Sequence, residues 1–309
     1  MNIQNPWNDY SSYIRKIFGS RVQKIAVDAG FSCPNRDGSI ATGGCIYCSN
    51  QSFSPYYCNN DNSNIKEQLQ QGINFFSPKY KTQKYLAYFQ TYTNTYADTE
   101  TCLDRYAEAL NVKGVVGLII ATRPDTVDKN LLCEIKKLVG SQYLAIEYGI
   151  ESTLNKTLDY INRGHNFGKA IEAVNLNKEL GITTGAHFIL GLPGESKDEM
   201  MEHANIINKL PIDIIKLHQM QIIRGTRADE MYAVNPNEFG IFDLNLYVTF
   251  VSEFLRKLKK TFIIERFTSE TPRETLVAPD WGGIKNFEVV HKIRNYMNEN
   301  NFKQGDLCK

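Results

Sequence analysis

Three of the chain's seven cysteines lie close together in one glycine-rich stretch, residues 28–50. They are Cys33, Cys45 and Cys48, and the same stretch holds Gly38, Gly43 and Gly44. A cubane iron–sulfur cluster takes thiolate ligands, normally one per iron, so three cysteines would leave one iron open to an outside ligand. The glycines would let the backbone wrap closely and offer N–H groups to cluster sulfurs. Spacing alone also allows a structural zinc site with Cys58 as the fourth ligand.

The elements around this stretch alternate between strand-like and helix-like patterns, and the cysteines follow the first strand. The predicted strands are 22–29, 84–92, 114–122, 142–152, 182–195 and 213–223, and the predicted helices are 64–76, 98–111, 128–140, 167–181, 197–210 and 243–260. Six such units predict an α/β fold with a parallel sheet, a partial (β/α)6 barrel first and a flavodoxin-like wound sheet second. In barrels the chemistry sits on loops after strand C-termini, where the cysteines lie.

The order of these elements predicts three regions. Residues 1–19 form a lead-in, residues 20–242 the barrel core, and residues 243–309 a C-terminal helix and cap that could face the substrate. The cap begins with the strand-like segment 262–267.

Composition limits the classes of protein that this chain can be. The formal net charge is +1 and the pI about 7.5, so the whole-chain charge does not favour nucleic acid or an anionic membrane. The first residues contain no apolar run typical of a signal peptide, and no segment approaches the roughly 18 apolar residues of a membrane span. We therefore expect a cytoplasmic protein without a membrane partner, and the sequence does not predict its oligomeric state.

The motifs resemble those of the radical S-adenosylmethionine (SAM) superfamily. The matching stretches are "CPNRDG", "GGCIYC", "AYFQTYTNTYA", "GIES", "NRGH", "LGLPGE" and "LVAPDW", from about residue 20 to residue 281. The wide spacing between Cys33 and Cys45 is similar to that of the branch containing the catalytic subunit of Elongator, and the chain resembles the bacterial YhcC-like family.

This resemblance implies a [4Fe-4S] cluster on Cys33, Cys45 and Cys48, with SAM on the open iron. It implies reductive cleavage of SAM to a 5′-deoxyadenosyl radical that abstracts a substrate hydrogen. A reducing electron donor such as flavodoxin or ferredoxin is then an expected partner.

The first group of candidate SAM contacts lies beside the cluster and after the second strand. Members of the superfamily often pack an aromatic side chain on the adenine of SAM at the position of Tyr47. Packing of Tyr47 in the protein core is an equally good interpretation. Members of the superfamily bind the methionine amine of SAM at the end of the second strand. At that place this chain offers the hydrogen-bond acceptors of Gln90, Thr93 and Asn94. The Gly-Gly-Glu of many members is absent here, and an ordinary polar turn is the alternative.

The second group of candidate SAM contacts lies after the fourth and fifth strands. Glu147 or Glu151 suits the ribose diol, and a buried salt bridge with Arg163 is the alternative. Arg163 matches the family's arginine for the methionine carboxylate. Gly191 belongs to a tight turn expected to pass close to adenine.

The histidines near these motifs are not assigned to SAM binding. We expect His187 and His218 to be core histidines, and His165 is as readily structural as functional.

The substrate is predicted from the resemblance alone. Elongator-like relatives act on the tRNA wobble uridine, so tRNA modified at the C5 substituent of that base is the expected substrate. Segment 254–260 clusters four cations, and segment 265–283 adds Arg266, Arg273 and Trp281, which suit phosphates and base stacking. A solvated helix face with a packed C-terminal cap is the alternative. A small-molecule or peptide substrate, or a non-catalytic zinc protein, also stays open.

Overall fold

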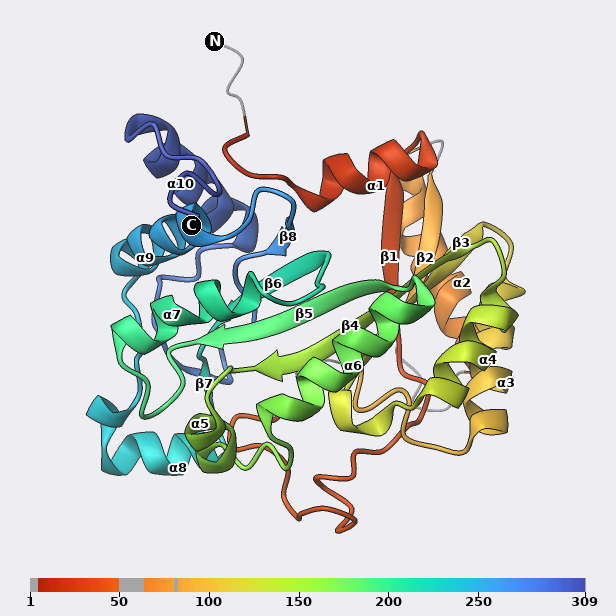
Figure 1. Cartoon of the computed structure of the whole chain (residues 1–309), viewed down its shortest axis with the longest axis horizontal. Coiled ribbons are helices and arrows are strands. Elements are labelled where there is room, and N and C mark those ends of the chain that lie inside the picture. The colour runs from red at the N-terminus through yellow and green to blue at the C-terminus, as the bar shows by residue number, and fades with distance from the viewer. Residues whose placement is uncertain (1–4, 50–63, 81–82, 309) are drawn as a thin grey trace.

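The computed structural model describes residues 5–49, 64–80 and 83–308. Its main feature is one curled sheet of parallel strands in the order β1-β2-β3-β4-β5-β6-β8 (Figure 1). These strands are β1 (Val22–Val27), β2 (Lys84–Phe89), β3 (Val115–Thr122), β4 (Tyr143–Glu151), β5 (Thr183–Leu190), β6 (Ile214–Gln219) and β8 (Ile263–Arg266). A small antiparallel pair is formed by β7 (Ile222–Ile223) and β9 (Leu276–Ala278).

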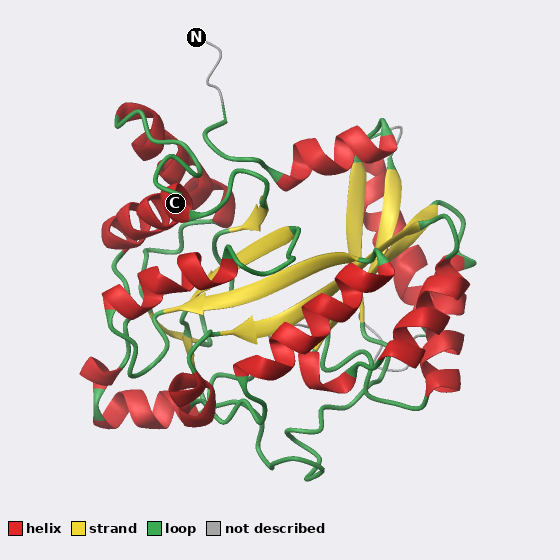
Figure 2. Cartoon of the chain, in the orientation of Figure 1, coloured by secondary structure: helices red, strands yellow, loops and turns green. Residues whose placement is uncertain are grey.

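Most of the helices lie against the outer face of the curl (Figure 2). The helices are α1 (Tyr10–Phe18), α2 (Ile65–Phe76), α3 (Thr99–Leu110), α4 (Lys129–Val139), α5 (Asn155–Tyr160), α6 (Phe167–Leu180), α7 (Lys197–Ile207), α8 (Arg227–Val234), α9 (Leu244–Lys257) and α10 (Asn286–Glu299).

Local sequence explains where many of these helices begin. Asn64 caps α2, accepting a hydrogen bond from the Glu67 amide while the Glu67 carboxylate accepts from the Asn64 amide. Asp98 caps α3 in the same position. Each of these caps satisfies a backbone N–H that has no partner within the helix. The predicted ranges 64–76 and 98–111 begin at these two capping residues, so both helix starts are confirmed.

The strands have two different faces, because successive side chains point to opposite sides. In β2, Ala87 and Phe89 belong to the core shared with the helices, whereas Leu86 and Tyr88 belong to a separate inner cluster. Ile14 of α1 packs into that inner cluster. Helix α1 therefore covers the inner face with apolar side chains.

The fold class is confirmed as an α/β partial barrel with a parallel sheet. The six predicted strands correspond to β1–β6, but segment 262–267, assigned to the cap, supplies β8 and pairs with β6. The sheet therefore has seven strands rather than six. Segment 182–195 was predicted as a strand with a turn, and β5 ends at Leu190, ahead of the Gly191 turn. Helices α1, α5, α8 and α10 were not predicted.

The pairing between β6 and β8 is interrupted by a bulge. Ile215 lies opposite Ile264, but Lys216 lies opposite Arg266, so Glu265 is an extra residue on β8. A bulge redirects side chains and breaks strict alternation. Here the Glu265 carboxylate contacts lysines of the inner face, while the next residue, Arg266, lines the cavity described below.

The two ends of the chain meet beside β8. The Gln304 side chain accepts a hydrogen bond from the Asn8 amide and donates to the carbonyls of Lys259 and Phe262. The amide of Ile264 donates to the Asn8 carbonyl. The segment before α1 is thereby held between β8 and the C-terminal residues.

Within the described ranges, no helix is both long enough and apolar enough to cross a bilayer.

Candidate active site

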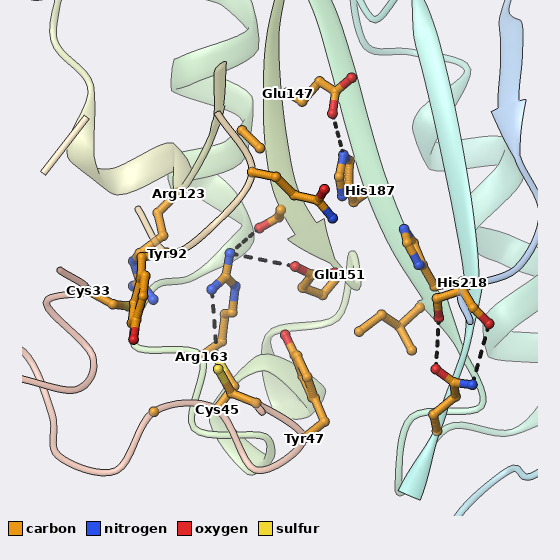
Figure 3. A pocket seen from close by; sticks show the side chains of 18 of the residues that line it. Cys33, Cys45, Tyr47, Tyr92, Arg123, Glu147, Glu151, Arg163, His187 and His218 are labelled. Atoms are coloured by element: carbon orange, nitrogen blue, oxygen red, sulfur yellow. Dashed lines mark hydrogen bonds and ion pairs between the residues drawn. The ribbon is translucent and has the colours of Figure 1, made fainter. Parts of the chain in front are cut away.

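One cavity of about 280 Å³ opens inside the curl, beside the loops that follow the strands (Figure 3). Its wall is drawn from the stretch after β1, from the later parts of β2 to β6, and from the segment after β8. It includes most of the residues selected from the sequence, namely Cys33, Cys45, Cys48, Tyr47, Gln90, Thr93, Glu147, Glu151 and Arg163. Folding brings these residues from distant parts of the chain to one place, as a shared site requires.

Two of the three cysteine thiols in the wall, those of Cys45 and Cys48, are approached by polar N–H groups. The Asn35 amide approaches Cys45 Sγ at 3.6 Å and the Arg163 guanidinium at 3.7 Å, while Arg36 approaches Cys48 Sγ at 3.5 Å. Burial, and then the neighbouring Cys45, raises the pKa of the Cys48 thiol, and Arg36 opposes this rise. No three of the described His, Cys, Asp and Glu side chains are arranged around a single metal ion. Cys58 lies outside the described residues.

Arg163 and Glu151 form a buried pair at the end of β4. Their closest nitrogen and oxygen are 3.7 Å apart, and the guanidinium also donates to the Gly149 carbonyl. A Cβ on Gly149 would lie 2.5 Å from Glu151 Oε1 and 2.7 Å from Arg163 Nη2. Only glycine at 149 therefore leaves room for the pair.

Two polar atoms beside this pair are buried without a partner among the described residues, Arg163 Nε and Tyr47 Oη. Burial and the nearby Cys45 raise the pKa of Tyr47, which keeps the phenol neutral. Burial likewise raises the pKa of Glu151, against the opposing effect of Arg163. A guanidinium N–H and a phenol hydroxyl at this end of the cavity are thus without a partner in the described part of the chain and could bind a polar ligand.

Glu147 lines the cavity, but its carboxylate pairs with residues other than Arg163. It pairs with Lys216 at 2.7 Å, with Lys24 at 3.2 Å and with His187 at 3.0 Å. The alternative of a buried salt bridge is therefore confirmed for both glutamates, but Arg163 is the partner of Glu151 and not of Glu147. Contact of Glu147 with a ribose stays a prediction.

The same lysines also bind Glu265, so a charged layer crosses the inside of the curl. Lys24 lies 2.6 Å and Lys216 3.2 Å from Glu265 Oε1. Although burial favours the neutral acid, Lys216 and Lys24 hold the pKa of Glu147 well below its usual range. A Cβ on Gly185 would meet Glu147 Cγ at 2.7 Å, which explains the glycine opposite it in β5.

The segment after β2 is divided between the cavity and the interior. Gln90 and Thr93 line the cavity, whereas Asn94 is fully buried and donates to the carbonyls of Phe89 and Ala121. Asn94 thus ties the ends of β2 and β3 together and is not part of the cavity wall. The predicted contacts of Gln90 and Thr93 with the methionine amine stay predictions.

Gly191 is also placed away from the cavity wall. Its carbonyl accepts from the Gly240 amide, and a Cβ there would lie 2.4 Å from the Gly240 carbonyl oxygen. The glycine allows this close approach of two loops. The neighbouring Ile189 lines the cavity instead.

The histidine and tryptophan interpretations need correction. His187 and His218 were expected in the core, but both line the cavity, with stacked rings 5.5 Å apart. Trp281, considered for base stacking, packs on Tyr247 and donates to the Phe242 carbonyl. His165 is mostly buried and contacts the Asn166 carbonyl, which fits a structural role.

Sequence analysis missed part of the cavity wall and the lysines beneath it. Lys24 and Lys216 interrupt otherwise apolar strands, and that interruption was the available signal for a charged layer. The contributions of Arg36, Arg123 and Gln221 carry no local signal, because they depend on how loops meet in space.

Comparison with known proteins gives two family models that cover most of the chain. Residues 37–207 match the model described as the radical SAM superfamily, and residues 212–299 match the radical SAM C-terminal domain. The division of the chain at residue 242 stays a prediction.

Curated relatives match along nearly the whole chain. The uncharacterized protein YtqA of Bacillus subtilis is 33% identical over 98% of this chain and 93% of its own length. Protein YhcC of Escherichia coli K12 is 33% identical over 97% and 94%. The tRNA uridine(34) acetyltransferase of Methanocaldococcus infernus is 26% identical over 63% of this chain, but over only 34% of its own.

Solved structures support the fold. Elp3 of Methanocaldococcus infernus superposes with a TM-score of 0.68 at 21% identity, over 92% of this chain and 64% of that one. SuiB of Streptococcus suis, solved with S-adenosylmethionine bound, has a TM-score of 0.50 at 14% identity, over 84% and 54%.

The curled parallel sheet, with three cysteines after its first strand, defines a radical SAM enzyme. Within that superfamily the chain belongs to the family of YhcC and YtqA. The cofactors of this fold are a [4Fe-4S] cluster and SAM.

The residues of the cavity fit both groups. Three thiols, two of which have N–H donors beside them, suit a thiolate-bound cluster, and the donors to Cys45 and Cys48 would stabilise the charge on its sulfurs. Arg163, with one unpartnered nitrogen, would hold a carboxylate, and Tyr47 and Glu151 lie beside it. When bound, the two cofactors supply reductive cleavage of the sulfonium and a carbon radical that removes a substrate hydrogen atom. The chain's own residues in the cavity wall would orient SAM.

Proposed function

We propose that this radical SAM enzyme modifies the C5 substituent of the wobble uridine in tRNA. The observation that carries the proposal is the relationship to enzymes described as tRNA uridine(34) acetyltransferases, which extends over 63% of this chain. The matched part of those enzymes is about a third of their length, so their complete activity is not transferred.

The cavity is compatible with a nucleoside substrate. On the side away from the cysteines it offers Tyr88, His218, Gln219 and Gln221, which combine aromatic faces with hydrogen-bonding groups. A uracil base needs both stacking and polar partners at its edges. A reducing protein of the flavodoxin or ferredoxin kind is the proposed source of electrons.

The proposal is tested in a strain lacking the gene, by digesting its tRNA and measuring the nucleosides by mass spectrometry. We expect one modified wobble uridine to disappear and a precursor with a different C5 substituent to accumulate. The wild-type gene should restore the profile, whereas a gene encoding Cys45→Ala should not. An unchanged nucleoside profile would reject tRNA and leave a small molecule or a peptide as the substrate class.

A further inference from the structure

The bulge in β8 places a guanidinium in the cavity wall whose charge is not paired. Arg266 lines the cavity and lies close enough to Tyr88 and His218 to influence their ionisation. Within residues 5–49, 64–80 and 83–308, its side chain has no hydrogen bond and no ion pair. Other arginines of the wall do have partners: Arg123 forks onto Asp125, and Arg163 pairs with Glu151.

The nearby carboxylates are already engaged elsewhere. Glu147 and the Oε1 atom of Glu265 bind Lys24 and Lys216. Glu265 Oε2 is buried without a partner among the described residues, and neither carboxylate pairs with Arg266. With Arg266 included, three cations face two carboxylates in this part of the interior. Glu270, at the exposed rim of the cavity, accepts a hydrogen bond from the Asn286 amide at 2.6 Å. The inner part of the cavity thus keeps one uncompensated positive charge.

A second group beside Arg266 also lacks a partner. His218 Nε2 is buried and makes no hydrogen bond to the described residues, although the ring lines the cavity. Burial, then His187 and Arg266, hold the pKa of His218 well below its usual value, so the ring is neutral. A neutral imidazole can donate one N–H to an anion without adding charge.

The frame around these two groups is fixed by side-chain amides. Gln219 exchanges two hydrogen bonds with the backbone of Ser269, and Gln221 accepts from the hydroxyls of Ser269 and Thr271. The segment after β8 is therefore held against the ends of β6 and β7. Such support keeps a binding group in place before the ligand arrives.

We propose that Arg266, assisted by His218, binds a negatively charged group of the substrate. The ligand chemistry is an oxyanion, either a carboxylate on the base substituent or a backbone phosphate. A guanidinium binds both in a bidentate fork, and the interaction is strongest where water is partly excluded. The RNA form of this inference rests on the proposed function.

The test uses the cluster-loaded enzyme with SAM, kept without oxygen, and three anticodon stem-loop RNAs. Their wobble uridine carries at C5 a carboxymethyl group, its methyl ester, or hydrogen. Dissociation constants are measured by fluorescence anisotropy for the wild type, Arg266→Gln and Arg266→Lys. Arg224→Gln, which removes an exposed arginine that does not line the cavity, is the matched control.

A carboxylate ligand predicts that the wild type prefers acid over ester by about tenfold or more, as expected for a charge-assisted pair. Arg266→Gln should abolish this preference, and Arg266→Lys should retain only part of it. A phosphate ligand predicts instead that Arg266→Gln weakens all three RNAs alike, whereas Arg224→Gln does not. Iron content, SAM binding and melting temperature of the variants should match the wild type.

Two outcomes separate this inference from the proposed function. If the wild type binds the RNAs and Arg266→Gln binds them equally well, the anion site is rejected and the RNA substrate survives. If the wild type binds none of them, the RNA proposal fails. Calorimetric titration with inorganic phosphate and with 5-carboxymethyluridine then decides, and binding that does not depend on Arg266 overturns the inference.

Discussion

Cys45 is approached by N–H groups from two different parts of the chain, Asn35 in its own loop and Arg163 after α5. Hydrogen bonds to sulfur favour the charged thiolate, which is the form that binds iron. Cys48 receives a similar contact from Arg36. The cysteine stretch is thus provided with compensating charge by residues of the same cavity wall.

At the level of single residues, we expect three cysteines and no fourth to be required for the cluster. Replacing Cys33, Cys45 or Cys48 by alanine should remove most of the iron and sulfide bound after anaerobic reconstitution, because each thiolate binds one iron. Cys58→Ser and Cys102→Ser should keep the wild-type content. Stoichiometric zinc in the wild type, or loss of iron in Cys58→Ser, would contradict this assignment.

At the level of the elements, the charged layer joins four strands of the sheet. Lys24 comes from β1, Glu147 from β4, Lys216 from β6 and Glu265 from β8. Removing one partner of a buried ion pair leaves an uncompensated charge in the interior, which strongly destabilises the folded state. This layer therefore penalises any sheet in which one of the four strands is missing or shifted.

We expect Lys216→Met to lower the free energy of unfolding by about 3 kcal/mol, because it removes a direct partner from each of the buried Glu147 and Glu265 carboxylates. Adding Glu147→Leu should recover much of this loss, since Lys24 and Glu265 remain as a neutral pair. Lys129→Met breaks an ion pair whose side chains are 58% and 56% exposed, and it should change little. Urea denaturation at pH 7 measures all three.

The stability difference between the wild type and Lys216→Met should depend on pH. The folded-state pKa of Glu147 lies below the usual value of 4.5, so the unfolded chain takes up the proton first as the pH falls. The stabilisation that the ionised Glu147 contributes is therefore complete above the unfolded-state pKa of 4.5 and declines as the pH falls below it. The difference between wild type and Lys216→Met should therefore narrow below about pH 4.5; a difference that stays constant to pH 4 would contradict the role of Glu147.

Elements whose signals are local could be predicted from the sequence, and those set by distant contacts could not. The start of α2 is written in Asn64 and Glu67, which satisfy each other's backbone groups. Strand β8 has only four residues, and its place beside β6 depends on a partner far away in the chain. In the site, the cysteines and Arg163 were found through motifs, whereas His187 and His218 were misjudged because alternation alone does not tell the core from a cavity.

At the level of the whole molecule, Gln304 joins the two ends of the chain. Replacing it by alanine leaves the Asn8 amide and the carbonyls of Lys259 and Phe262 without their partner. We expect a loss of about 2–4 kcal/mol, because some of these groups regain water. Hydrogen exchange measured by mass spectrometry should become faster across residues 5–20 as well as near β8.

Gln304→Glu serves as a comparison for that substitution, since it keeps the acceptor for the Asn8 amide but replaces the two donors with a carboxylate oxygen that faces the carbonyls of Lys259 and Phe262. The increase in hydrogen-exchange rate across residues 5–20 should be smaller in Gln304→Glu than in Gln304→Ala. Unchanged exchange in that segment of Gln304→Ala would show that α1 is held by its apolar contacts alone.

The single extra residue in β8 has a consequence for how related enzymes can diverge. Deleting one position there would restore regular alternation, so Glu265 could no longer contact the inner lysines while its neighbour Arg266 lines the cavity. A change of chain length by one codon would thus decide whether a cation or an anion lies at this position on the inner side of the sheet. Lineages that differ in this length are where a switch from acidic to basic or neutral substrates should be sought.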